Sequence, residues 1–406
     1  MRRMRWMAVG ALAVAALGCE RKPQEEQRSG TAAQESAKPD GGAAGAQPGT
    51  PPQDSNTILI GEVGSLTGSE ATFGISTRNG IDLALKQENA NGGVEGKKVV
   101  VRVYDDQGKP EEAANAATRL ISQDRVLLIL GEVASTNSLA MAAKAQPAQV
   151  PMITPSSTNT RVTEVGDYIF RVCFIDPFQG FAMAKFATEN LKSKTAAVLK
   201  DQKSDYSLGL ADVFTKKFTE FGGKILGTEA YAKGDTDFRA QLTSIKRLRP
   251  DVLYVPGYYT DVGLVARQAR ELGVKSTLLG GDGWDSDKLF ELGGSAVDGS
   301  YFTNHYSPQD PSPRVQRFIQ EYKAEFGSIP DSLAALGYDA ARVAIEGMRK
   351  ARELTGPAVR DALAQTKDFP GVAGNITLDE KRNAVKPAVV LKVTGGKTEF
   401  VASVAP

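Results

Sequence analysis

Short apolar runs alternate with longer stretches of helical spacing along most of the chain. Thr57–Val63 and Lys98–Asp105 are examples of the apolar runs, and Phe73–Asn89 between them has helical spacing and ends before Gly92 and Gly93. Most of these runs are apolar almost throughout, which is typical of parallel strands covered by helices on both faces. The repeated strand–helix order predicts a doubly wound α/β sheet.

The strand–helix series occurs twice, and each series has the length of an ordinary domain, so we expect two similar lobes. The expected strands are 57–63, 98–105, 126–130, 151–154, 195–200, 251–255 and 277–279. The expected helices are 73–89, 110–123, 135–145, 206–221, 237–247 and 261–272.

The first residues have the pattern of a targeting segment. A start with three arginines precedes the apolar run Met7–Leu17, which is too short to cross a bilayer and is typical of a signal peptide over residues 1–18. Residues 16–19 resemble a bacterial lipobox, in which Cys19 would carry the lipid and become the mature N-terminus. The alternative is ordinary cleavage near Ala15, which would leave Cys19 free.

The next stretch has no large apolar residue. From Glu20 to Ser55 there is no Val, Ile, Leu, Met, Phe, Tyr or Trp. Such a segment has too little apolar surface to fold. We therefore predict a flexible tether over residues 19–55, and a folded body that begins near Asn56.

Charge and composition exclude several classes of protein. The chain has 406 residues with 49 Lys plus Arg and 48 Asp plus Glu, a net charge of +1, so it lacks the basic excess of a nucleic-acid binder. The single histidine, His305, and the two cysteines, Cys19 and Cys173, are too few for His/Cys zinc sites or a CxxC redox pair. We expect no cofactor and no metal.

No catalytic fingerprint is present. Gly395–Thr398 resembles the end of a P-loop, but Leu391 stands where the first glycine belongs and the segment is expected to be a turn between two strands. We expect His305 to be a surface or hinge residue rather than a base, and Cys173 to be a buried hydrophobic residue rather than a nucleophile.

Two loops rich in hydroxyl groups follow neighbouring strands. The first includes Val133 and Ser135, and the second includes Ser156, Ser157 and Thr158. Open α/β sheets bind ligands at the carboxyl ends of their strands, and hydroxyl and N–H groups at a helix start suit a carboxylate. Helix capping is the alternative, but one hydroxyl per loop would satisfy it. The sequence therefore favours an anion-binding site.

Three loops of the second series could complete a pocket. Tyr206 and Tyr258 follow strand ends, and Asp282 follows another strand within Gly280–Gly283. A carboxylate among glycines can approach a ligand closely, and tyrosines provide aromatic walls with a polar tip. Each loop alone is explained as an ordinary turn, but their common position at strand ends favours a site.

These stretches resemble the branched-chain amino-acid binding proteins of bacterial ABC transporters, which are type I periplasmic binding proteins. The resemblance covers nearly all of residues 56–404 and includes GEVGSLTGSEATFG, PMITPSST, GYYTDVGLVARQARELG and LLGGDGWDS. It implies two doubly wound parallel-sheet lobes, joined by three hinge crossovers, that close on one ligand like a Venus flytrap. Lobe 1 would comprise residues 56–175 and 304–379, and lobe 2 residues 176–303 and 380–406.

The resemblance also implies roles for individual residues. The ligand carboxylate would be held by Ser135 and Thr158, with main-chain groups of Ser156 and Ser157. Tyr206 and Tyr258 would close over the ligand, and Asp282 would hold its ammonium group, with Asp285 as a competitor. An apolar pocket would be lined by Phe73, Val133 and Leu333. The family's disulfide is absent, and Glu132 would repel a ligand anion if it turned inward.

The sequence therefore predicts a monomeric, membrane-anchored lipoprotein of the periplasm or cell envelope. It would capture a small amino acid, such as leucine, isoleucine or valine, and deliver it to the permease subunits of an ABC transporter. Three alternatives stay open: a ligand-sensing partner of a membrane receptor, a binder of amides or small aromatic acids, and an α/β enzyme, against which the lack of motifs argues.

Overall fold

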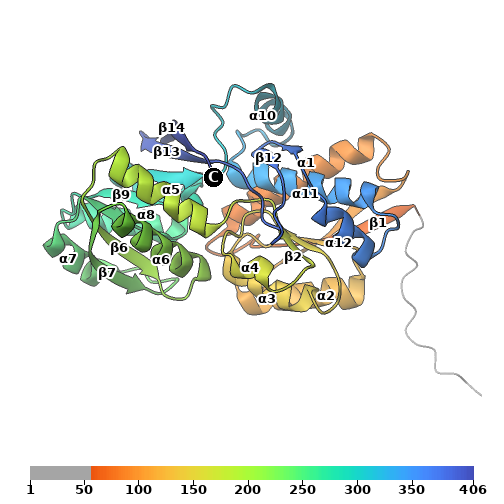
Figure 1. The fold of residues 1–406 in the computed structure, drawn as a ribbon, viewed down its shortest axis with the longest axis horizontal. Coiled ribbons are helices and arrows are strands. Elements are labelled where there is room, and N and C mark those ends of the chain that lie inside the picture. The colour runs from red at the N-terminus through yellow and green to blue at the C-terminus, as the bar shows by residue number, and fades with distance from the viewer. Residues whose placement is uncertain (1–55) are drawn as a thin grey trace, which may run out of the picture. The chain divides into compact units, whose positions relative to one another are not determined.

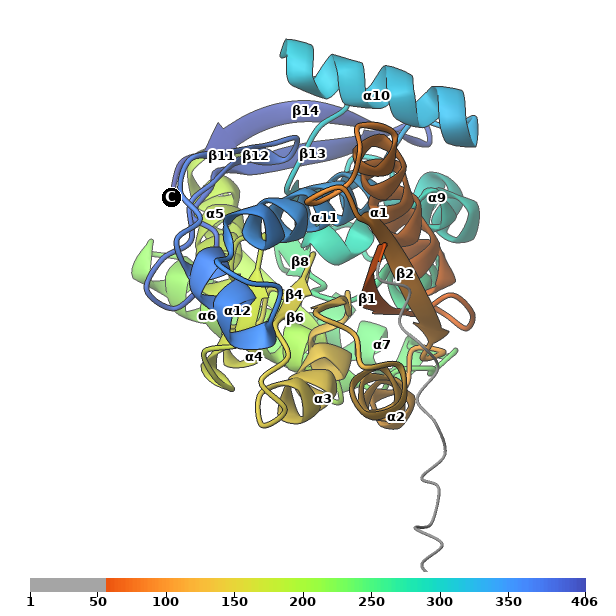
Figure 2. The ribbon, with the colours of Figure 1, turned by 90° about the vertical axis from the view of Figure 1, so that its right-hand side faces the viewer.

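The computed structural model of the protein describes residues 56–406. The predicted signal peptide, the predicted lipid site at Cys19 and the predicted tether lie outside the described residues. Two large sheets, each with helices packed on both faces, make up the described body (Figures 1 and 2). We call the first sheet with its helices lobe 1 and the second lobe 2.

The sheet of lobe 1 is parallel throughout. Its five strands follow the order β2-β1-β3-β4-β5. Their bounds are β1 Thr57–Gly64, β2 Lys98–Asp105, β3 Ile129–Leu130, β4 Met152–Thr154 and β5 Ile169–Arg171.

The sheet of lobe 2 has seven strands in the order β14-β13-β10-β9-β8-β6-β7. Five of them are parallel, and the hairpin β13–β14 adds to β10 in the antiparallel direction. Their bounds are β6 Thr195–Asp201, β7 Lys224–Tyr231, β8 Val252–Tyr254, β9 Thr277–Gly280, β10 Tyr301–Asn304, β13 Ala388–Thr394 and β14 Lys397–Val404; the small pair β11 Phe369–Gly371 and β12 Gly374–Ile376 stands apart from both sheets.

The helices are α1 Ala71–Ala90, α2 Pro110–Arg119, α3 Ser135–Ala145, α4 Arg161–Glu164, α5 Asp176–Glu189, α6 Asp205–Glu220, α7 Arg239–Leu248, α8 Tyr259–Glu271, α9 Asp287–Gly293, α10 Pro313–Phe326, α11 Ser332–Lys350 and α12 Gly356–Ala364; short turns are η1 Leu120–Asp124, η2 Asp282–Trp284 and η3 Gly294–Val297.

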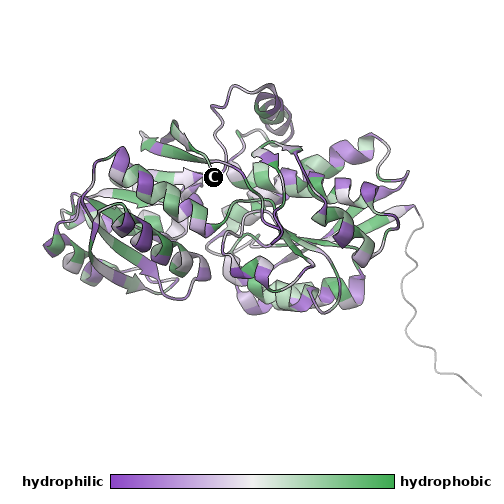
Figure 3. Ribbon diagram, in the orientation of Figure 1, coloured by the Kyte–Doolittle hydropathy of each residue, from purple (hydrophilic) through white to green (hydrophobic). Residues whose placement is uncertain are grey.

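Each sheet has a separate apolar core on each face. In lobe 1, Ile58 and Ile60 of β1 pack with α1 and α11, whereas Val63 packs with α2 and α3. In lobe 2, Ala196 and Val198 of β6 pack with α5 and α6, and the opposite face packs with α7 and α8. The apolar residues therefore concentrate along the strands and the inner helix faces (Figure 3).

The chain passes between the lobes three times. It leaves lobe 1 after β5 through residues 172–175, and it returns after β10 through residues 305–312 to α10 and α11. It enters lobe 2 again before β13, where Leu378 and Ala384 form an isolated bridge. The predicted fold class is confirmed; the residue limits of the predicted lobes stay a prediction.

Most predicted elements form close to their predicted bounds, but two differ in extent and several elements of the structure were not predicted. The strand predicted over 126–130 is confined to Ile129–Leu130, and the helix predicted over 110–123 changes after Arg119 to the π-helical turn η1. Strand β7 was not predicted. It lies at the sheet edge beside β6 alone, and most of its residues are only half-buried, so its sequence lacks a continuous apolar run.

Candidate functional site

The two loops rich in hydroxyl groups meet at the carboxyl end of the lobe 1 sheet. Gly131 begins the first loop with a φ of +110°, and a Cβ atom there would lie 2.1 Å from the carbonyl oxygen of Val63, so only glycine fits. Ser135 starts α3, and its Oγ accepts a hydrogen bond of 3.3 Å from the N–H of Asn159 in the second loop. This bond holds the loops side by side.

The hydroxyl groups of the second loop do not all have the same use. The Ser157 hydroxyl bonds to the carbonyl oxygens of Glu132 and Val133, at 3.1 and 2.8 Å, and so ties the loops together. The Oγ of Ser156 and the Oγ1 of Thr158 are buried and have no hydrogen-bond partner among the described residues. Buried hydroxyl groups without partners are costly, so these two are candidates to bind a ligand.

On the lobe 2 side, Asp282 already has partners for both carboxylate oxygens. The Tyr206 hydroxyl donates to Oδ1 at 2.9 Å, and Nε2 of His305 lies 2.9 Å from Oδ2. His305 was predicted to be a surface or hinge residue. It is not a surface residue, since it is 3% exposed, but it does lie on the second crossover between the lobes. This pairing could not be predicted from the sequence, because the partners come from separate segments.

The glycines around Asp282 allow two tyrosines to approach the main chain. A Cβ on Gly281 would lie 2.6 Å from the Tyr206 hydroxyl, and one on Gly283 would lie 2.8 Å from the Tyr258 ring. The rings of Tyr206 and Tyr258 stack with centroids 5.0 Å apart. The predicted tyrosines and the predicted acid therefore form one compact group.

One buried acid of this region was missed by the sequence analysis. Asp176 is the first residue of α5, is 2% exposed, and neither of its carboxylate oxygens has a partner among the described residues. Burial raises the pKa of Asp176 to about 8. The Thr158 hydroxyl, which lies near this carboxyl without a formed hydrogen bond, and the charge of Arg171 oppose the shift, whereas the charge of Asp282 adds to it. An acid at a helix start followed by proline looks ordinary, so only the structure reveals it.

The predicted apolar pocket residues belong to one buried cluster. Phe73, Val133 and Leu333 of lobe 1 share it with aromatic residues of lobe 2. The Phe73 ring meets Tyr258 and Tyr259 edge-on, with centroids 5.6 and 4.8 Å apart. The three residues are thus placed together where the lobes meet.

The lobes contact each other directly through polar groups as well. The Thr260 hydroxyl donates to the carbonyl of Ser69 at 2.6 Å, and Lys233 Nζ lies 2.7 Å from a carboxylate oxygen of Glu70. The Asn159 side chain donates to the carbonyl of Asp205 at 2.7 Å. The structure is therefore a closed arrangement of the two lobes.

Glu132 does turn inward, but its oxygens are occupied. Oε2 accepts from the N–H of Ala134 at 2.5 Å, and Oε1 accepts from the Ser65 hydroxyl at 3.0 Å. Complete burial, helped by Asp106 and Glu70, holds the pKa of Glu132 well above its usual range. The protonated form is favoured, so the expected repulsion of a ligand anion is weakened.

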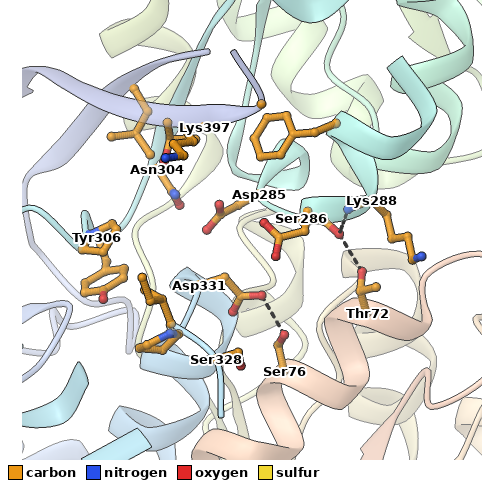
Figure 4. A pocket seen from close by; sticks show the side chains of 18 of the residues that line it. Thr72, Ser76, Asp285, Ser286, Lys288, Asn304, Tyr306, Ser328, Asp331 and Lys397 are labelled. Carbon is orange, nitrogen blue, oxygen red and sulfur yellow. Dashed lines mark hydrogen bonds between the residues drawn. The ribbon is translucent and has the colours of Figure 1, made fainter. Parts of the chain in front are cut away.

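Asp285 lies apart from the predicted ligand residues, beside a hollow between the lobes. A hollow of about 580 Å³ is bordered by both lobes, and Asp285, Asp331 and Tyr306 are among the residues around it (Figure 4). None of the predicted ligand residues lines it. Asp285 accepts a hydrogen bond from the N–H of Ser332 at 2.8 Å, so it faces the start of α11 rather than Asp282's partners.

Three other features concern the described residues alone. Cys173 is buried and its burial raises the pKa of the thiol to about 12, which confirms it as a buried hydrophobic residue. Within residues 56–406, no three His, Cys, Asp or Glu side chains are grouped to hold a metal ion. No helix in that range is long and apolar enough to cross a membrane.

A two-lobed fold with polar loops meeting at strand ends is typical of solute-binding proteins. The sequence profile of the periplasmic binding protein family matches residues 57–397, and the chain belongs to this family. The predicted family and the prediction of a binding protein rather than an enzyme are therefore confirmed.

Three similar proteins are named as binding proteins for leucine or branched-chain amino acids. The Leu/Ile/Val-binding protein BraC3 of Rhizobium johnstonii is 33% identical over 80% of this chain and 88% of its own length. The leucine-binding protein LivK of Thermotoga maritima has a TM-score of 0.83 and 41% identity, covering 86% of this chain and 99% of its own. The branched-chain amino-acid binding protein LivJ of Streptococcus pneumoniae, solved with isoleucine, has a TM-score of 0.82 and 34% identity over 86% and 100%.

Proposed function

We propose that this protein captures a branched-chain amino acid between its lobes in the cell envelope and delivers it to the permease subunits of an ABC transporter. The observation that carries the proposal is a set of buried polar groups without partners, Ser156, Thr158 and Asp176, beside an apolar cluster between two lobes. A zwitterion with an aliphatic side chain would satisfy both parts.

The carboxylate would bind to lobe 1. Ser135 and Thr158 would donate their hydroxyl groups, and the main chain of Ser156 would complete the set. Ser157 has no free donor, because its hydroxyl is used between the loops and its N–H donates to the Thr154 hydroxyl at 3.0 Å. Hydrogen bonds to a charged partner contribute about 1.5–3 kcal/mol each.

The ammonium group would bind between two acids. Asp282 is oriented by Tyr206 and His305, and Asp176 has no partner of its own. Tyr206 and Tyr258 would cover the ligand from lobe 2. The aliphatic side chain would contact Phe73, Val133 and Leu333, and burial of a Leu- or Val-sized group contributes about 1.5–3 kcal/mol.

The envelope location rests on the N-terminal pattern and the family. We infer that residues 1–18 are removed, that Cys19 is lipidated, and that residues 19–55 tether a monomeric binding body to the membrane. Metabolic labelling with a fatty acid tests this inference: wild type should be labelled and Cys19→Ala should not. Equal labelling of the two would contradict it.

A ligand panel tests the binding function. Leucine, isoleucine and valine should each raise the melting temperature, because a ligand that binds only the folded state adds about 2.7 kcal/mol of stability at 100 times its Kd. Glycine should bind at least about tenfold more weakly, since it lacks the buried side chain. If glutamate, an amide or benzoate binds best, the branched-chain assignment is wrong.

A further inference from the structure

Arg171 is an unusual residue beside the proposed carboxylate site. It is the last residue of β5, its side chain is completely buried, and it directly precedes the first crossover between the lobes. None of the ion pairs within residues 56–406 involves it. Burial lowers the pKa of its guanidinium, but arginine stays protonated in proteins. A buried cation without an acid in contact needs an explanation.

The guanidinium binds almost only main-chain oxygens, and these belong to the hydroxyl-rich loop. Nη1 makes a short hydrogen bond to the carbonyl of Ser157, and Nη2 donates to the carbonyl of Asn159 at 2.8 Å. Nη2 also lies 3.2 Å from the Thr163 hydroxyl. Arg171 therefore determines which way these peptide groups face.

The orientation of one peptide group fixes the neighbouring donor. In a trans peptide the C=O and the following N–H point in opposite directions. Because the Ser157 carbonyl faces Arg171, the N–H of Thr158 faces the other side of the loop. The Thr158 carbonyl accepts from the N–H of Asp176 at 2.9 Å, which holds the next peptide in place as well. Thr158 thus presents an N–H group and an unpartnered hydroxyl to a ligand.

We propose that Arg171 is a positioning residue for carboxylate recognition, which orients the loop 156–159 from behind and adds a positive charge to its field. The inference rests on the proposed function in one respect only, that the ligand carries a carboxylate. Asp176 and Asp379 also act on the charge of Arg171, though neither forms an ion pair with it, and this charge would favour the ligand carboxylate across the loop without touching it.

The test compares two ligands that differ only at the carboxylate. Leucine has it, and leucinamide replaces it with a neutral group while keeping the ammonium and the side chain. By calorimetry on the full chain, Arg171→Met should lower leucine affinity at least about 30-fold and leucinamide affinity less than about threefold. Arg171→Lys keeps the charge but loses the fork to two carbonyls, so it should fall between wild type and Arg171→Met.

Arg382 is a matched control. It lies on the third crossover and donates to the carbonyls of Ile169 and Thr163, outside the segment 156–159. Arg382→Met should change leucine affinity less than about threefold. Unfolding of each variant without ligand reports stability separately.

Three results would overturn the inference. The first is an equal loss of leucine and leucinamide affinity in Arg171→Met, which would indicate a purely structural role. The second is wild-type leucine affinity in Arg171→Met. The third is equal binding of leucine and leucinamide by the wild type. If Arg171→Met does not fold, Arg171→Lys decides by the same ratio of affinities. Failure of the proposed function appears differently, as no wild-type response to any amino acid. Benzoate and benzamide then replace leucine and leucinamide. Equal losses of affinity for benzoate and benzamide in Arg171→Met would overturn the inference.

Discussion

The polar groups proposed to bind a ligand are arranged in opposite ways on the two lobes. On lobe 1, the hydroxyl groups of Ser156 and Thr158 are buried without partners. On lobe 2, both oxygens of Asp282 are already engaged by Tyr206 and His305. Lobe 1 therefore keeps free donors for a ligand, whereas lobe 2 keeps a fixed charge.

The difference follows from the free-energy cost of burying each kind of group without a hydrogen-bond partner. A buried hydroxyl without a partner costs about 1–3 kcal/mol, but a buried charge without a partner costs more. Lobe 2 therefore cannot leave Asp282 free, and the tyrosine hydroxyl and the imidazole hold the carboxylate in one place. A fixed carboxylate needs little reorganisation when an ammonium arrives.

The largest expected effect comes from removing the fixed charge. Asp282→Asn keeps the size and the contact with Tyr206 but leaves a bound ammonium without its main counter-ion. Leaving a charge unpaired in an interface costs about 2–5 kcal/mol. Calorimetry should therefore show a loss of leucine affinity between about 30-fold and several thousand-fold.

Asp285→Asn is the control for this variant, because Asp285 lies in the separate hollow beside Asp331 (Figure 4). Its affinity for leucine should stay within about threefold of wild type. If Asp285→Asn weakens binding and Asp282→Asn does not, the ammonium site has been placed on the wrong acid. If neither variant changes affinity, the ligand has no ammonium group.

The second effect tests the free donors of lobe 1. Thr158→Val keeps the shape but removes the hydroxyl, so leucine affinity should fall by about 1.5–3 kcal/mol, or roughly 10- to 150-fold. Stability without ligand should not fall, because a buried group without a partner has been removed.

Ser157→Ala should behave in the opposite way. Its hydroxyl joins the loops through Glu132 and Val133, so thermal unfolding should show a loss of about 1–3 kcal/mol. A loss of stability in Thr158→Val, or none in Ser157→Ala, would contradict the division between free and structural hydroxyl groups.

The third effect concerns the acid without partners. Because burial raises the pKa of Asp176 to about 8, this carboxyl is mostly protonated at pH 6.5. A nearby ammonium favours the ionised form, so binding of leucine at pH 6.5 should release about one proton. The number follows from binding enthalpies in two buffers of different ionisation enthalpy.

Asp176→Asn should abolish this release, and in wild type the release should fade above about pH 8, where Asp176 is already ionised. An unchanged release in the variant would show that the proton comes from another group. Affinity for leucine should fall less than in Asp282→Asn, since Asp176 is not held in place by partners.

Much of the fold could be predicted because most strands are buried on both faces. Strands β1, β2 and β6 form runs of β-favouring residues, and their bounds lie within one residue of the predicted ones. The edge strand β7 was not predicted because Gly, Thr and Glu interrupt its apolar residues, whereas the edge strand β2, which is no more buried, was predicted from its run of valines. A strand is detected from sequence where its β-favouring residues form a continuous run.

Site residues could be predicted from the sequence only where a segment had more residues of one type than helix capping or a turn requires. The hydroxyl-rich loops met this condition, because capping explains one hydroxyl in each. Asp176 and Arg171 did not, since an acid at a helix start and an arginine at a strand end are common. Their roles depend on Thr158 and Ser157, which are distant in sequence and close in space.

The smallest expected effect is on stability and concerns two acids that lie near each other from different lobes, Asp331 and Asp285. The proposed ligand site, in contrast, brings hydroxyl groups of lobe 1 towards an acid of lobe 2. At the hollow of Figure 4, Asp331 accepts hydrogen bonds from Ser76 and the N–H of Ala334, with Asp285 nearby. Burial, followed by the charge of Asp285, raises the pKa of Asp331 to about 7 from an ordinary 3.8. The folded protein therefore binds a proton here more tightly than the unfolded chain does.

Stability must then fall as the pH rises between about 4 and 7, because in this window the folded state holds a proton that the unfolded state has lost. Asp331→Asn removes this titration, and asparagine keeps the helix cap. Relative to wild type, the variant should gain at least about 1 kcal/mol of unfolding free energy between pH 5 and pH 8, measured by denaturant titration. Asp287→Asn, at an exposed acid of the same hollow, should show a much smaller gain, because the charge of Asp287 raises the pKa of Asp331 less than burial and Asp285 do. Parallel pH profiles for Asp331→Asn and wild type would mean that Asp331 ionises normally and that closure brings no repulsion at this hollow.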